Sequence, residues 1–198
     1  RGAEMIEKMV FAAGASDSSM EVIRCMKSMR KLGIKKCLLL QCYSPGEEAS
    51  AIGGIVGEIY EENLARQKEL LEEQGYEVET RIVKGSLENE VNDIAEKENA
   101  DIIVTKATNR SLIGDAVFKG LAYEVLHKSE KPVMLVRANF KADADIECDI
   151  MNHIMFPTDF SENAAKAFGA LKSLAPCHGT KITLVHVQDT TRMDSELL

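Results

Sequence analysis

The sequence predicts a three-layer α/β sandwich, in which helices cover both faces of a five-stranded parallel sheet. Three observations carry this prediction. Short apolar runs alternate with longer amphipathic segments from residue 7 to residue 136, which is the pattern of strands joined by helical crossovers. The run 37–40, Cys-Leu-Leu-Leu, is apolar throughout, as in a central strand covered on both faces. The pattern of the first strand restarts near Ile154, which predicts a tandem repeat.

Each expected strand is an apolar run bounded by turn or cap residues. The five strands are expected near residues 7–13, 37–40, 77–83, 102–104 and 133–136. A cluster of helix N-cap residues at 16–19 follows the first strand, and the helix that it begins is expected to end at Gly33. Further helices are expected over residues 52–74, from Ser86 onward and over residues 116–128.

The long helix at 52–74 is predicted to be amphipathic. Its apolar residues recur at helical spacing and predict a buried stripe, formed by Ile52, Ile55, Val56, Ile59, Tyr60, Leu64 and Leu71. Its many glutamates are interpreted as a solvated helix face and not as a metal site, because they alternate with this stripe at helical spacing.

The composition is that of a folded, acidic protein. Hydrophobic residues make up 45% of the chain and charged residues 28%, which excludes a disordered acidic chain. The net charge of -8 argues against a protein built to bind nucleic acid or an anionic membrane. No apolar run approaches the ~20 residues that a membrane-spanning helix needs, and the residues at the start do not resemble a signal peptide.

The five cysteines are odd in number and include no Cys-x-x-Cys pair, so neither a disulfide framework nor a zinc site is indicated. We expect reduced thiols, a cytoplasmic location and no metal site. The histidines are isolated, and we interpret His186 as a structural residue at a strand end. No Ser-His-Asp or Cys-His set has an interpretable spacing, so no catalytic residue is assigned.

The repeat has an offset of 154 − 9 = 145, because the segment that begins at Ile154 follows the pattern of the segment that begins at Met9. We predict a first domain over residues 5–138, a linker over 139–151 and the N-terminal part of a second domain over 152–198. That last part holds only a strand, a helix and a strand, too little to bury a core by itself. We therefore expect the chain to be a fragment, or a protein whose remainder is supplied elsewhere.

Common nucleotide-binding motifs are absent. Ligands of open parallel sheets bind beyond the carboxyl ends of the strands, yet no Gly-x-Gly-x-x-Gly follows the first strand and no acidic residue closes the second at 41–43. The order Lys84-Gly85-Ser86 is not that of a phosphate-binding P-loop. No paired carboxylates follow the first strand, so the sequence does not predict a phospho-acceptor receiver domain either.

The ordered set of motifs that is present resembles the universal stress protein family. The second copy carries Ile-Met-Phe-Pro-Thr-Asp-Phe-Ser at 154–161 and Ile-Thr-Leu-Val-His-Val at 182–187. In the first copy the resemblance to the family lies in Asp-Ile-Ile-Val at 101–104, the loop that follows it, and Glu-Lys-Pro-Val-Met-Leu-Val at 130–136. The resemblance covers almost the whole chain. It implies a Rossmann-like fold of the adenine nucleotide α-hydrolase type, a role in stress resistance and dimers that often form through the last strand. Some members bind ATP or AMP, and others bind no nucleotide.

The resemblance implies an adenine-nucleotide site in the second copy. Binding members hold the adenosine with the Asp of the first turn and the end of the second strand, and the matching residues here are Pro157, Thr158, Asp159 and Val187. A carboxylate can accept hydrogen bonds from the nucleoside, and backbone groups can bind the adenine edge. In the alternative interpretation, Asp159 and Ser161 only cap the following helix.

The first copy departs from the family pattern and is expected to hold a degenerate site. Gly14 stands at the position of the Asp, and Lys106 and Asn109 stand where binding members have glycines. Side chains at those positions obstruct backbone contact with phosphate, although Lys106 and Arg110 could supply charge instead. The spacing to Gly120 is one residue longer than in the family.

We therefore expect an adenine-nucleotide-binding protein of the stress response, in which AMP or ATP binds the second domain. The first domain is expected to serve mainly as a pairing module, within a homodimer. A nucleotide-independent dimerisation or interaction module is the first alternative and is supported by the lost glycines. A weak ATPase is the second, although no residue set positions a water or a metal, so an enzyme is not the favoured interpretation.

Overall fold

The computed structural model describes residues 6–13, 18–43, 53–107, 121–137, 149–174 and 179–187. The predicted residues Gly14, Asn109, Arg110 and Gly120 lie outside these ranges. The chain divides into two compact units, with the boundary in the sequence between Asp149 and Ile150. We call residues 5–149 the larger unit and the part from residue 150 onward the smaller unit, and we describe each by itself.

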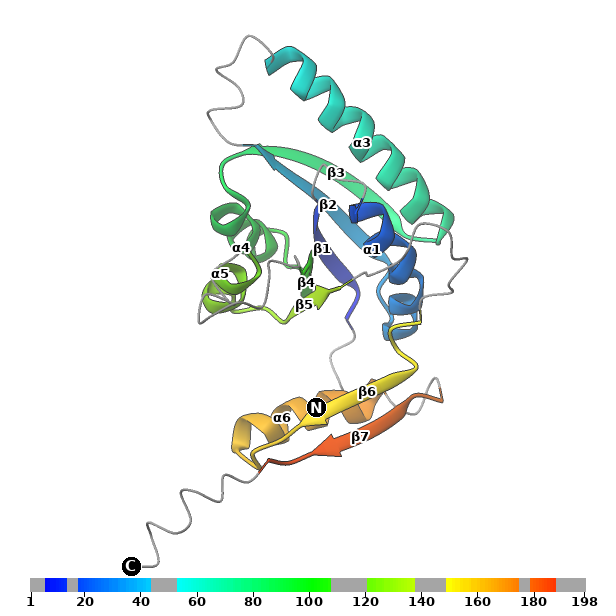
Figure 1. The fold of residues 1–198 in the computed structure, drawn as a ribbon, viewed down its shortest axis with the longest axis vertical. Helices are drawn as coiled ribbons and strands as arrows, with labels where there is room; N and C mark the ends of the chain where they lie inside the picture. The colour runs from blue at the N-terminus through cyan, green and yellow to red at the C-terminus, as the bar shows by residue number, and fades with distance from the viewer. Residues whose placement is uncertain are drawn as a thin grey trace, which may run out of the picture. The chain divides into compact units, whose positions relative to one another are not determined.

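The larger unit is built on a parallel sheet of five strands in the order β3-β2-β1-β4-β5 (Figure 1). The strands are β1 (Lys8–Ala13), β2 (Lys36–Tyr43), β3 (Glu77–Lys84), β4 (Ile102–Lys106) and β5 (Val133–Val136). Every neighbouring pair is parallel, so the predicted five-stranded parallel sheet is confirmed. The chain crosses from β3 at one edge back to β4, which makes the β1–β4 junction the point where the strand order reverses.

Helices cover both faces of this sheet, which confirms the three-layer architecture. The helices are α1 (Ser18–Met26), which continues as the 3-10 helix η1 (Lys27–Leu32), α3 (Gly53–Glu73), α4 (Leu87–Lys97) and α5 (Leu121–Lys128). Figure 1 shows α4 and α5 on one side of the sheet and α1 and α3 on the other. Right-handed crossovers require this division, because the chain moves across the sheet in opposite directions before and after β3.

The core lies on both faces of the central strands. On the α4 and α5 side, a cluster of buried residues joins the helices to the sheet through Val10, Ala12, Leu38, Leu40, Val91, Ile94, Ala95, Ala100, Ile103 and Val125. On the other side, the alternate residues of β1 and β2 are buried, including Met9, Phe11, Cys37 and Leu39. This two-sided burial explains why the strand sequences are apolar without alternation.

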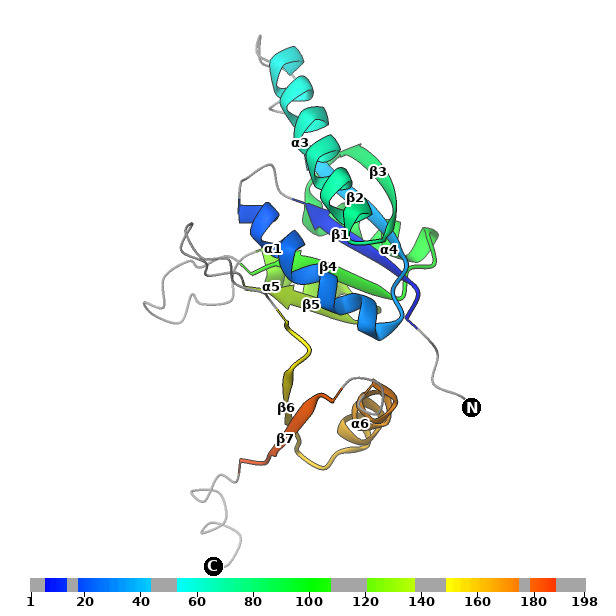
Figure 2. The same ribbon diagram turned by 90° about the vertical axis from the view of Figure 1, so that its right-hand side faces the viewer.

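Among the described residues of the predicted α3 stripe, full burial is confined to the later turns. Leu64 and Leu71 are buried, as expected, but Ile59 is 47% exposed. The two ribbon views show the reason, because α3 begins well beyond the ends of its neighbouring strands (Figures 1 and 2). The prediction for Ile59 is therefore wrong, since helical spacing marks a face of the helix and not how far the sheet extends beneath it.

The cysteines differ from the expectation of reduced thiols at one position. Cys25 of α1 is disulfide-bonded, so that expectation is wrong for this residue. Cys37 is buried and free, and burial raises the pKa of its thiol to about 12. Cys42 is also free. Because disulfides are uncommon in reducing compartments, the disulfide of Cys25 does not support a cytoplasmic location, which stays a prediction.

The smaller unit repeats the pairing of the first two strands. It consists of β6 (His153–Pro157), α6 (Glu162–Leu174) and β7 (Lys181–Val185), with β6 and β7 parallel. Met9 pairs with Cys37 in the larger unit, and Ile154 pairs with Ile182 in the smaller unit. Each residue number differs by 145 between these pairs, and the whole β6–β7 register follows the same shift. Phe156 of β6 packs against Phe168 of α6, with ring centroids 5.5 Å apart.

Among the described residues, no helix is both long enough and apolar enough to cross a membrane.

One buried hydrogen bond provides a test of the core. The Tyr76 hydroxyl, at the start of β3, donates to the backbone carbonyl of Met26 at 2.6 Å, and Tyr76 is only 4% exposed. We predict that Tyr76→Phe lowers the free energy of unfolding by about 1–2 kcal/mol, because a buried carbonyl loses its hydroxyl donor. Tyr43→Phe, at a half-buried tyrosine, is the control. Urea denaturation checks the difference, and equal effects of the two substitutions would contradict the prediction.

Candidate functional site

The candidate site lies at the carboxyl ends of β6 and β7. Pro157 is the last residue of β6, Thr158 and Asp159 follow it, and Val187 lies two residues beyond the end of β7. The backbone N–H of Thr158 donates to the carbonyl of Val185 at 2.9 Å. The structure therefore brings together the turn after β6 and the chain that leads to Val187, because the strands are parallel and end at the same edge.

Asp159 is exposed and held within its turn. Its Oδ1 accepts a hydrogen bond from the backbone N–H of Ser161 at 2.9 Å. Hydrogen bonds from the side chain and the backbone of Ser161 hold the pKa of Asp159 below its usual value, and the nearby His186 acts in the same direction. The carboxylate is thus ionised at neutral pH and available as an acceptor for a ligand with N–H or O–H donors.

Ser161 provides the helix cap. Its Oγ accepts the backbone N–H of Ala164 at 3.1 Å, which is the contact between an N-cap side chain and the third helical residue. Asp159 lies two residues before this cap and orients the turn that leads into it. The capping role is confirmed for Ser161, whereas Asp159 bonds to the cap residue itself, and its part in ligand binding stays a prediction.

Two further residues adjoin the turn and were not assigned to the site by sequence reasoning. Phe160 has a backbone φ of 61°, which is rare for a bulky residue, and is 75% exposed. Its ring lies against the imidazole of His186, with centroids 4.6 Å apart. The only sequence signals were an aromatic residue directly after the Asp and a histidine at the strand end.

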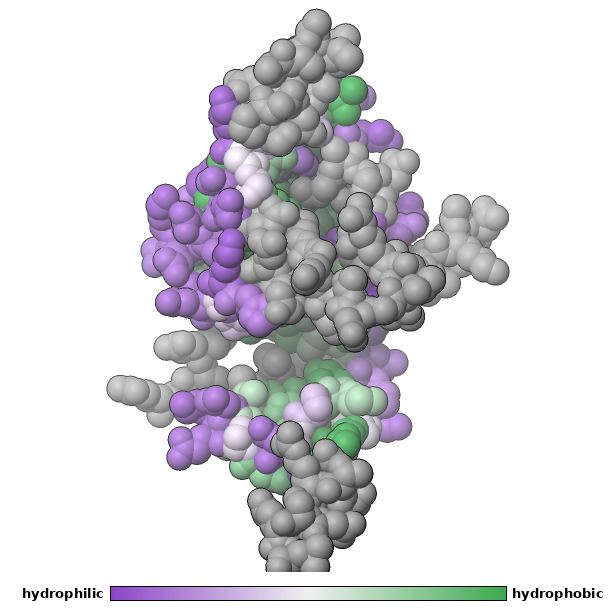
Figure 3. All heavy atoms as spheres, turned by 60° about the vertical axis from the view of Figure 1, so that its left-hand side comes forward, coloured by the Kyte–Doolittle hydropathy of each residue, from purple (hydrophilic) through white to green (hydrophobic). Residues whose placement is uncertain are grey.

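A shallow apolar groove of about 320 Å³ runs from this turn across the α6 side of the sheet. It is lined by Phe156, Thr158, Phe160, Ser161, Ala164, Ala165, Phe168 and Leu184. Figure 3 shows hydrophobic, green residues on the surface of the smaller unit, in the lower part of the picture. Val187, beyond the end of β7, is 82% exposed. Apolar surface therefore adjoins the charged turn.

At the corresponding edge of the larger unit, Lys106 is the predicted site residue that lies within the described ranges. Lys106 ends β4 and is half-buried, beside the point where the strand order reverses. Among the described residues, no group of three or more His, Cys, Asp or Glu side chains could hold a metal ion.

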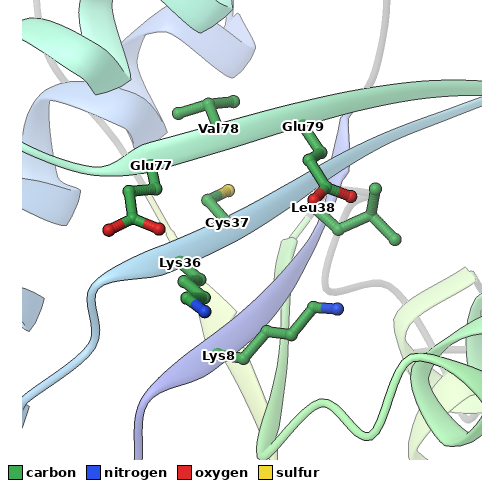
Figure 4. Close-up of a pocket in the computed structure, with 7 residues that line it drawn as sticks. All are labelled: Lys8, Lys36, Cys37, Leu38, Glu77, Val78 and Glu79. Carbon is green, nitrogen blue, oxygen red and sulfur yellow. The ribbon is translucent and has the colours of Figure 1, made fainter.

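A second hollow of about 260 Å³ lies at the opposite, amino edge of the larger sheet (Figure 4). Lysines of β1 and β2 and glutamates of β3 line it, and the labelled residues are Lys8, Lys36, Cys37, Leu38, Glu77, Val78 and Glu79. Lys8 is already engaged, because its Nζ contacts Glu98 at 2.7 Å. Arg81 contacts the other oxygen of Glu98 at 2.6 Å. This edge is therefore occupied by internal ion pairs.

The helix cap predicts a local effect on α6. We expect Ser161→Ala to speed amide hydrogen exchange at Ala164 roughly five-fold, since losing an N-cap costs about 1 kcal/mol. Asp159→Asn should leave that rate nearly unchanged, because an amide oxygen can still accept from Ser161. Exchange followed by NMR measures both, and equal acceleration in the two variants would contradict this division of roles.

The ion pairs of Glu98 predict a pH dependence. Hydrogen bonds from Lys8 and then Arg81 lower the pKa of Glu98 from its ordinary 4.5. Its contribution to stability is therefore present above about pH 4.5 and is lost as pH falls through the lower, folded-state pKa. We predict that Glu98→Gln loses less stability than the wild type between about pH 5 and pH 3. Glu96→Gln is the control, at an exposed glutamate for which the described part of the chain shows no ion pair, and parallel curves for all three proteins would refute the prediction.

Comparison with known proteins places this fold and site in context. The sequence model of the universal stress protein family matches residues 5–137. Universal stress protein MJ0531 of Methanocaldococcus jannaschii is 25% identical over 149 residues, which span 69% of this chain and 85% of that protein.

Solved structures show the same fold. A universal stress protein from Archaeoglobus fulgidus DSM 4304 superposes with a TM-score of 0.73 at 20% identity, over 98% of this chain and 72% of its own. A universal stress protein from Archaeoglobus fulgidus in complex with dAMP superposes with a TM-score of 0.50 at 20% identity, over 67% of this chain and 98% of its own. Since the family model covers more than half of the sequence, the chain belongs to the universal stress protein family.

Proposed function

We propose that this protein binds an adenine nucleotide, AMP or ATP, at the carboxyl ends of β6 and β7. The observation that carries the proposal is the hydrogen-bonded junction between the Asp159 turn and the end of β7, which brings an ionised acceptor close to the backbone that leads to Val187. The dAMP complex of the related Archaeoglobus protein supports this ligand class. Ligands of parallel α/β sheets bind at this edge.

Each residue of the proposed site has a role that follows from its chemistry. Asp159 accepts hydrogen bonds from the hydroxyls or amino group of the nucleoside. The backbone at Val187, beyond the last strand pair, provides a donor and an acceptor for the edge of the base. Pro157 and Thr158 form the floor of the turn next to the apolar groove, which suits a flat base.

We propose a different role for the larger unit, as a pairing module in a tandem protein of the stress response. The shared register of β1–β2 and β6–β7 supports the repeat. The apolar strand β5 forms an edge of its sheet, and such an edge can pair with another chain in a homodimer. Lys106 stands in place of a glycine, which also favours the second candidate, a nucleotide-independent interaction module. In either case the protein acts in the cytoplasm.

The proposal predicts that Asp159→Ala weakens AMP binding at least ten-fold, because losing hydrogen bonds to a charged group costs about 1.5–3 kcal/mol. Isothermal calorimetry with AMP and ATP measures the effect. Glu162→Gln, which removes one negative charge from the nearby first turn of α6, is the control and should bind within two-fold of the wild type.

Two outcomes would contradict the proposal. If the Asp159→Ala variant binds nucleotide as tightly as the wild type, the carboxylate does not have the role that we propose. A wild-type protein that shows neither heat nor thermal shift with millimolar nucleotide would favour the interaction module.

A further inference from the structure

His186 joins the two segments that form the proposed site. Its Nδ1 lies 2.8 Å from the carbonyl oxygen of Thr158, across 28 residues of sequence. A carbonyl oxygen only accepts, so Nδ1 carries the proton and donates this hydrogen bond. The imidazole thus binds the residue directly before Asp159 and stands directly before Val187 in the chain.

The position of the imidazole is fixed from a second side. The ring of Phe160 packs against it with centroids 4.6 Å apart and an angle of 50° between the ring planes. Phe160 adopts a left-handed backbone conformation, which a bulky side chain rarely takes unless surrounding contacts hold it there. The hydrogen bond and the ring contact therefore orient both ends of the Asp159 turn.

We infer that His186 is a positioning residue for nucleoside binding, which sets the separation between the Asp159 carboxylate and the backbone at Val187. This inference rests on the function proposed above. The backbone bond from Thr158 to Val185 ties the start of the turn to the end of β7, whereas the bond from Ser161 to Asp159 lies within the turn itself. The bond from His186 is a second attachment between the turn and the β7 segment, and two attachments restrict the turn more than one does before the ligand binds.

His153 provides a matched control. It is the histidine at the other, amino end of the same strand pair, and its Nε2 lies 2.8 Å from Oγ1 of Thr183 on β7. Both histidines are exposed, and both link the β6 segment to the β7 segment. If histidine contacts in this unit act only on its stability, substitutions at the two positions should have similar effects on ligand binding.

The test uses variants that separate the hydrogen bond from the ring contact. His186→Phe keeps a flat ring next to Phe160 and removes the donor. His186→Asn keeps an N–H donor at the same distance from the backbone as Nδ1. His186→Gln places the donor one bond further out and is a second disruptive variant if the phenylalanine is not tolerated. Full-length wild type, these variants and His153→Phe are titrated with AMP and with adenosine, and thermal melts confirm folding.

We expect His186→Phe and His186→Gln to bind AMP roughly five-fold more weakly, which corresponds to about 1 kcal/mol for one hydrogen bond. Adenosine should lose the same factor, because the effect concerns the nucleoside and not the phosphate. His186→Asn and His153→Phe should bind within two-fold of the wild type.

Several results would overturn the inference. Wild-type affinity in His186→Phe and His186→Gln would show that the contact does not position the site. Equal losses in His153→Phe, or no rescue by His186→Asn, would show a general structural effect. If the wild type binds nucleotide while any of these holds, only this inference fails. If the wild type binds neither AMP nor adenosine, the proposed function fails and the inference falls with it.

Discussion

The parallel pairing of β6 and β7 is the constraint on which the candidate site depends. Because both strands end at the same edge, the turn after β6 and the segment after β7 become neighbours, although Thr158 and His186 are 28 residues apart in the sequence. Backbone pairing alone would bring the ends close without fixing the turn. The bonds from Thr158 to Val185 and from His186 to Thr158 convert this proximity into a defined arrangement.

The larger unit uses the two edges of its sheet differently. At the amino edge, Oδ2 of Asp101 accepts the backbone N–H groups of Glu7 and Lys8 at 2.8 and 2.9 Å, which ties the start of β1 to the start of β4. The ion pairs of Glu98 lie at the same edge. These side-chain contacts lie at the edge opposite to the one where ligands of parallel α/β sheets bind.

The parts of the structure that the sequence predicted are those set by local burial. A strand covered on both faces must be apolar throughout, and Leu38 and Leu39 show this without knowledge of their neighbours. The exposure of Ile59 depends on where the sheet ends. The disulfide of Cys25 depends on which cysteine approaches it, and the hydrogen bond of His186 depends on a turn that is far away in the sequence. Each is a tertiary relation, which spacing along the chain does not encode. Asp159 was found because its motif is continuous in the sequence, and His186 was assigned to a structural role because it stands alone.

The two units share the same strand register but differ in the residues that follow their first strands. β1–β2 and β6–β7 pair in the same way at a shift of 145 residues, so the backbone at the ends of these strands provides equivalent positions in both units. The residues at those positions differ, because Asp159 follows Pro157 and Thr158 whereas Gly14 follows Ala12 and Ala13. The unit with Asp159 at this position and the unit with Gly14 share the same strand pairing, so the pairing by itself does not distinguish them. If the proposed nucleotide site is correct, the two units are distinguished by the side chains of the turn after the first strand and by the His186 contact that orients this turn in the smaller unit.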